Sequence, residues 1–157
     1  MTRIRPTAKL LPLALAALAR QACAGGPFDA SGARAELRAG RALWEREGPA
    51  DYGYTIRRTC FCGPAASGPV RVEVRGGRTV SVSTLGGQSV ARGDFDRLDT
   101  VEELFEAVED AIEADPYQLT SAYDPARGHP VALAVDYDRY TVDEENGFQV
   151  TDFVALR

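Results

Sequence analysis

Cys60 and Cys62 are the residues of this chain whose type and spacing could do chemistry. In a strand, residues i and i+2 point to the same face, so the two thiols should lie close together, with their Cα atoms near the upper limit that a disulfide spans. A kink before Gly63-Pro64 would bring them within reach. Three alternatives stay open: a structural disulfide, which the sequence favours, two buried reduced thiols, and a redox or metal-binding pair.

Arg58 lies two positions before Cys60 on the same predicted strand face, where its guanidinium could lower the pKa of a thiol. Zinc usually takes four ligands, whereas the chain after residue 24 has two cysteines and one histidine, so we expect no metal site. That histidine, His129, lies between Gly128 and Pro130 in a predicted turn, where we expect it to contact solvent. The sequence has no nucleophile elbow and no phosphate-binding glycine loop, so it predicts no catalytic residue and no cofactor. We therefore favour a protein that is not an enzyme.

The first 24 residues have the order typical of a cleaved export signal. A positive start is followed by an apolar run and then by small residues, namely Arg3, Arg5 and Lys9, Leu10 to Ala19, and Ala22-Cys23-Ala24. The apolar run is shorter than the roughly 20 residues that span a bilayer. Cleavage before Gly25 would remove Cys23; in the alternative, Cys23 is the acylated first residue of a lipoprotein. We expect the protein to be exported to the periplasm, the cell surface or the medium, and to meet a membrane only through that lipid.

The expected mature chain is strongly acidic. Four of the 18 basic residues and none of the 23 acidic ones lie in the first 24 positions, so 14 basic and 23 acidic side chains remain. Binding to nucleic acid depends on clusters of basic residues around the phosphates, and here the arginines alternate with acids. Nucleic acid is therefore excluded as a partner class.

The remaining chain predicts a flexible leader over residues 25–32 and a single domain over residues 33–157. Its elements are a helix at 33–47, strands at 52–62, 70–75 and 80–83, a helix from Val101 to the Asp115-Pro116 stop, and strands at 117–123, 131–138 and 148–156. Gly76-Gly77 provides the turn of a hairpin, and Thr100 with Glu103 forms a capping box. The order α-β-β-β-α-β-β-β predicts a two-layer α+β domain, an antiparallel sheet with two helices on one face.

The apolar spacing also predicts which side chains meet in the core. One face of the second helix should pack on the inward face of the sheet, with Leu104, Phe105, Val108 and Ile112 against Val72, Val80, Leu133 and Val135. Three aromatic residues, Trp44, Tyr52 and Tyr54, could form an exposed binding platform or pack the first helix onto the sheet. The core interpretation is favoured, because alternate aromatics on a strand beside a helix are typical of a two-layer interface.

Several short motifs run along the chain. They are Trp44, Asp51-Tyr52-x-Tyr54-Thr55, Cys60-Phe61-Cys62, Pro69-Val70-x-Val72, Glu102-Glu103-Leu104-Phe105, Tyr123-Asp124-Pro125-x-x-Gly128-x-Pro130 and Asp136. Together they resemble a bacterial domain-of-unknown-function family, number 6174, over about Ala42 to Phe153. The resemblance implies a small exported or lipid-anchored envelope protein with no assigned activity. Gly63 and His129 depart from the family pattern, which often has Pro and Tyr there.

These observations favour an uncharacterised exported envelope protein whose domain binds without catalysis. Its partner would be an envelope protein, a peptide or a cell-wall component, held by an exposed sheet face or edge. The alternative is an envelope thiol-redox protein that uses Cys60 and Cys62, with Arg58 as the residue that tunes the thiol.

Overall fold

The computed structural model describes residues 28–60, 68–91, 98–140 and 146–157. Its helices and strands are α1 (Ala30–Glu47), β1 (Tyr52–Thr59), β2 (Val70–Arg75), β3 (Arg78–Thr84), α3 (Val101–Glu113), β4 (Gln118–Tyr123), β5 (Pro130–Asp136) and β6 (Asn146–Ala155). This order confirms the predicted sequence of elements. The expected export signal, including Cys23, lies outside the described residues.

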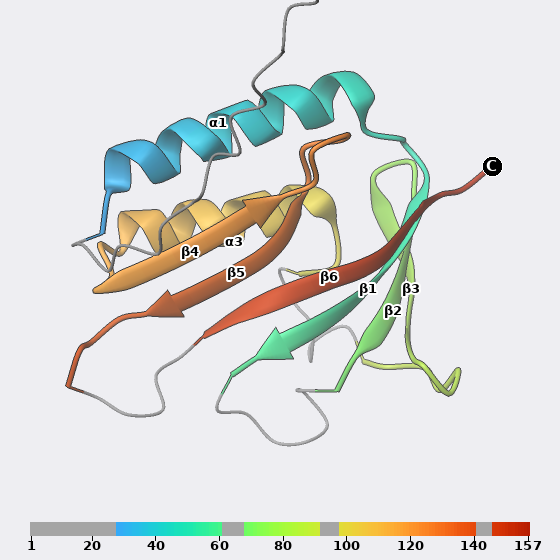
Figure 1. Ribbon diagram of the computed structural model, residues 1–157. Coiled ribbons are helices and arrows are strands. Elements are labelled where there is room, and N and C mark those ends of the chain that lie inside the picture. The colour runs from blue at the N-terminus through green and yellow to red at the C-terminus, as the bar shows by residue number, and fades with distance from the viewer. Residues whose placement is uncertain (1–27, 61–67, 92–97, 141–145) are drawn as a thin grey trace, which may run out of the picture.

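The strands form one antiparallel sheet in the order β3-β2-β1-β6-β5-β4. The three strands before α3 lie next to one another in the sheet, and so do the three strands after it. Pairing of β1 with β6 connects the two sets. Figure 1 shows α1 and α3 side by side over one face of the sheet. The predicted two-layer α+β fold, with both helices on one face, is confirmed.

Both helices begin at residues whose side chains satisfy free backbone N–H groups. The Asp29 carboxylate accepts hydrogen bonds from the amides of Ser31 and Gly32, so α1 begins at Ala30, within the segment predicted as a leader. At α3 the Thr100 hydroxyl accepts from the Glu103 amide at 3.2 Å. The Glu103 carboxylate accepts in return from the backbone N–H of Asp99 at 3.0 Å, one residue earlier than in the usual capping box.

The predicted core face of α3 is confirmed, because all four of its apolar residues are buried against the sheet. Val80 is the exception on the sheet side and is 56% exposed. The β2–β3 register shifts between Glu73 and Val74, so that Val74 pairs with Thr79 while Val72 pairs with Val82. The extra residue in this bulge breaks the alternation of side chains, and the prediction that Val80 lies in the core is therefore wrong.

A second bulge lies where β6 passes β1. The register shifts between Gly53 and Thr55, and Asp152 has a φ of 52°, in the left-handed region. The added residue lets Phe153 face the helix-covered side, where it packs against the core. Without the bulge, strict alternation from Phe148 would direct Phe153 to the opposite face.

Within the described ranges, no helix is long and apolar enough to cross a membrane.

Candidate functional site

Trp44, Tyr52 and Glu102 connect both helices to the sheet. The indole Nε1 of Trp44 donates to one Glu102 carboxylate oxygen at 3.1 Å, and the Tyr52 hydroxyl donates to the other at 3.3 Å. The Tyr52 oxygen also accepts from the Val101 amide at 3.0 Å, at the start of α3. Burial raises the pKa of the Tyr52 phenol, so it stays protonated and keeps its donor role. Trp44 and Tyr52 are buried, as predicted for core residues.

His129 lies in this cluster and not in solvent. Only 1% of the residue is exposed, its ring stacks on Phe153 at a centroid distance of 4.2 Å, and the edge of Trp44 approaches at 5.9 Å. The prediction of a solvent-contacting turn histidine is therefore wrong. Burial is the main cause that lowers the pKa of the imidazole; the Asp124 carboxylate opposes it and Arg127 adds to it. The ring thus acts as a neutral packing group.

The end of the turn between β4 and β5, at Gly128 and His129, is buried because it packs against α1. Gly128 has a φ of +83°, and a Cβ built there would overlap the carbonyl oxygen of Gly40 and lie 2.7 Å from Cβ of Leu43. The Asp124 carboxylate accepts from two amides of the turn and holds its shape. Only a residue without a side chain permits this approach of turn and helix.

Cys60 follows β1 directly and is half-buried. Cys62 lies outside the described residues, so the pairing of the two thiols stays a prediction. Arg58 is half-buried and pairs with Phe148 of β6. It lines a cavity of about 290 Å³ beneath α3, together with Asp110 and a floor that includes Leu133. The lowering of a thiol pKa by Arg58 likewise stays a prediction.

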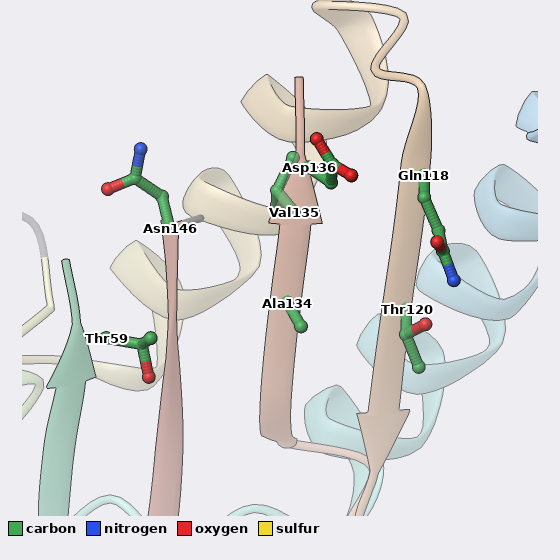
Figure 2. Close-up of a pocket in the computed structure, with 7 residues that line it drawn as sticks. All are labelled: Thr59, Gln118, Thr120, Ala134, Val135, Asp136 and Asn146. Atoms are coloured by element: carbon green, nitrogen blue, oxygen red, sulfur yellow. The ribbon is translucent and has the colours of Figure 1, made fainter. Parts of the chain in front are cut away.

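The face of the sheet opposite the helices carries hollows of its own. Figure 2 shows one of about 230 Å³, with the helices behind the strands. Its lining comes from four strands and consists of Thr59, Gln118, Thr120, Ala134, Val135, Asp136 and Asn146. We call this hollow the Ala134 hollow.

A larger hollow of about 310 Å³ lies over Gly53 of β1. It is bounded by backbone and side chains of Gly53, Tyr54, Thr55, Arg71, Val72, Glu73, Ser81, Asp152, Val154 and Leu156. Glu73 is held by Arg75, whose Nε and Nη2 both lie 3.0 Å from the same carboxylate oxygen. Arg71 is exposed and, among the described residues, makes no hydrogen bond or ion pair. We call this hollow, with Arg71 and Asp152 on opposite sides of β1, the Gly53 hollow.

Comparison with known families matches residues 36–155 to the family of unknown function DUF6174. The chain belongs to DUF6174. The match extends slightly beyond the region of the resemblance identified from the sequence motifs. No curated protein and no solved structure matches the chain.

The motifs that point to DUF6174 hold the fold together in this chain. Trp44, Tyr52, Glu102 and Gly128 all lie where α1, α3 and the β4–β5 turn meet. The Gly53 hollow is built mainly from other residues. No sequence signal indicated that Asp152 lies across β1 from Arg71, because this depends on the bulge in β6.

Proposed function

We propose that this DUF6174 protein is an exported, non-catalytic envelope protein that binds a peptide, a protein or a cell-wall component on the helix-free face of its sheet. The observation that carries the proposal is the difference between the two faces. Both helices cover one face, whereas no described helix or strand covers the other (Figure 1), and the Ala134 hollow and the Gly53 hollow open there. Concave surfaces on a rigid sheet that combine apolar groups with a few polar ones are suited to ligand binding.

Burial shifts the pKa values of several side chains, and the position of these side chains supports binding over catalysis. Desolvation is the main cause that raises the pKa of Tyr54 and Glu103 and lowers that of His129. All three lie on the helix-covered side, in packed or capping positions: the Tyr54 hydroxyl donates to the Leu98 carbonyl, and Glu103 caps α3. Catalytic groups with perturbed pKa values are typically found in a cleft open to substrate.

The choice of face can be tested by filling the Ala134 hollow. Ala134→Trp places a large side chain there, and Ala39→Trp, on the exposed side of α1, is the matched control. The mature protein should sediment with purified bacterial cell-wall sacculi or envelope peptides, and Ala134→Trp should weaken this association about tenfold or more while Ala39→Trp leaves it unchanged. Equal binding by both variants would show that the ligand does not use the Ala134 hollow.

Export itself is tested by the mature N-terminus. The order of charges, apolar run and small residues supports cleavage that leaves Gly25 or Cys23 first. Intact mass of the protein from an envelope fraction gives the answer, and a protein that retains Met1 would contradict the proposal.

Thiol-redox activity is a second candidate, because Arg58 occupies the strand position two residues before Cys60 and is half-buried. A guanidinium in that position favours the thiolate. Exchange of the wild-type protein with a glutathione couple should then slow in Arg58→Ala. Unchanged exchange, or no exchange at all, would exclude this role.

A further inference from the structure

The Gly53 hollow has an empty centre because its floor is a glycine. Gly53 is buried in β1, and the three atoms nearest to a Cβ built on it are the carbonyl oxygen of Val72 at 3.3 Å, Cγ2 of Val154 at 3.8 Å and Cδ1 of Leu156 at 3.9 Å. The hollow above the strand is therefore bordered by one backbone oxygen on the β2 side and by two apolar side chains on the β6 side. A volume of about 310 Å³ lies at the small end of the range for ligand sites, which fits a molecule of amino-acid or dipeptide size.

Arg71 supplies a positive charge at one side of this space. In the register it pairs with Thr55, next to the glycine floor. Its strand neighbour Arg75 is engaged by the carboxylates of Asp51 and Glu73. Arg71 is exposed and has no such partner among the described residues, so its planar guanidinium is available for bidentate binding of a carboxylate.

Asp152 supplies a negative charge at the other side. Its left-handed φ of 52° is a conformation that Asp and Asn tolerate better than other residues with side chains. The carboxylate lines the hollow and accepts one hydrogen bond, from the Thr151 hydroxyl at 3.1 Å. Its remaining lone pairs can accept from an ammonium group.

The two charges lie on strands separated by β1 alone, so their backbones are roughly 10 Å apart. Both residues line the hollow, so their side chains border the space between the two strands. An extended dipeptide separates its terminal charges by about two residue lengths, or roughly 7 Å. The spacing therefore fits a ligand with a carboxylate at one end and an ammonium at the other.

We infer that the Gly53 hollow binds a zwitterionic dipeptide, with its carboxylate on Arg71, its ammonium on Asp152 and its side chains along Val154 and Leu156. This inference rests on the proposed function and names its ligand class. It assigns the two charged residues separate roles, which separate probes can measure.

Isothermal titration calorimetry with Ala-Ala, N-acetyl-Ala-Ala and Ala-Ala-amide tests the assignment on the mature chain. Ala-Ala should bind saturably below about 10 mM, and loss of either terminal charge should weaken binding about tenfold. Arg71→Gln should remove the preference for the free carboxylate. Asp152→Asn, which keeps the local backbone conformation accessible, should remove the preference for the free ammonium while leaving the carboxylate preference intact.

Arg57→Gln is the matched control, because Arg57 is an exposed arginine of β1 that does not line the hollow. It should bind Ala-Ala as the wild type does, and thermal melts of the three variants verify that each is folded. No saturable binding by the wild type, or equal loss in Arg57→Gln and Arg71→Gln, would overturn the inference. Sedimentation with sacculi that Ala134→Trp weakens, without dipeptide binding, would leave the proposed function standing and reject this ligand class.

Discussion

The contact between Gly128 and α1 should account for several kcal/mol of stability, and Gly87 provides an unusually close control. Both glycines have a φ of +83°. An alanine in the left-handed region costs about 1–2 kcal/mol in backbone strain at either position. A Cβ at Gly87 would meet nothing within 4 Å, whereas a Cβ at Gly128 would overlap the Gly40 oxygen and lie 2.7 Å from Leu43 Cβ and 3.0 Å from the Trp44 nitrogen.

The difference between the two variants therefore isolates the steric cost. Carbon atoms pack best at about 3.5–4.0 Å, so α1 must move by roughly 1 Å to admit the methyl group. Overpacking of this kind costs typically about 1–3 kcal/mol. We expect Gly87→Ala to lose about 1–2 kcal/mol and Gly128→Ala about 3–5 kcal/mol in the free energy of unfolding.

Urea unfolding of both variants, followed by tryptophan fluorescence, measures these values, because the only tryptophan of the chain, Trp44, lies beside Gly128. A difference under about 0.5 kcal/mol between Gly128→Ala and Gly87→Ala would refute the reasoning, since it would mean that the turn and the helix separate without cost.

Three further outcomes are expected. Phe105 is 2% exposed, so Phe105→Ala should lower the free energy of unfolding in urea by about 3–5 kcal/mol. Val80→Ala, in the exposed bulge, should change the same free energy by under about 0.5 kcal/mol. Similar losses in the two variants would contradict the burial of Phe105 between α3 and the sheet. Because burial lowers the pKa of His129 below its ordinary 6.5, the folded state binds fewer protons than the unfolded state below that pH, so stability should fall between pH 7 and 5 by up to about 1.4 kcal/mol per pH unit. His129→Gln should remove this part of the slope in pH-dependent melts, and an unchanged slope would contradict a buried neutral imidazole. Arg41→Ala should cost less than about 1 kcal/mol in the same melts, because its ion pair with Glu109 is partly exposed; a loss above about 2 kcal/mol would show that the pair is structural.

The order of the elements could be predicted because each one carries a local signal. The capping box at Thr100 and the apolar spacing that follows it define α3, and Gly76-Gly77 between alternating strands defines the β2–β3 hairpin. A helix cap, the spacing of apolar residues and a glycine turn each involve only a few neighbouring residues, so they can be recognised from the sequence alone. The start of α1 was missed because its cap, Asp29, lies in a segment rich in Gly and Pro.

The bulges in β3 and β6 could not be predicted, and the misplacement of Val80 follows from the first of them. Strict alternation places Val80 in the core and would direct Phe153 outward, yet each strand inserts one residue and reverses the alternation beyond it. A bulge is often marked by glycine in the left-handed region, but here Asp152 takes that conformation. Pairing across strands, which is not local, decides where the extra residue lies.

The burial of His129 could not be predicted either, because it also depends on contacts between distant parts of the sequence. Its neighbours, Gly128 and Pro130, correctly predict a turn, and turns are usually exposed. The end of the turn, with His129, is buried because Gly128 lies against Gly40 of α1, a contact between residues far apart in the sequence. The cysteine motif was the clearest chemical signal in the sequence, yet it gave no information about the helix-free face of the sheet.

Different residues of the chain hold the fold together and border the Gly53 hollow. Motif residues such as Trp44 and Glu102 are engaged in joining α1, β1 and α3. Arg71 and Asp152, in contrast, lie on the helix-free face and outside the sequence motifs that identify the family. The match to DUF6174 therefore rests on residues that hold the scaffold together, whereas the inferred ligand contacts lie at residues that do not pack between the helices and the sheet. Substitutions of Arg71 and Asp152 consequently test the inferred binding without removing a contact that joins α1, β1 and α3.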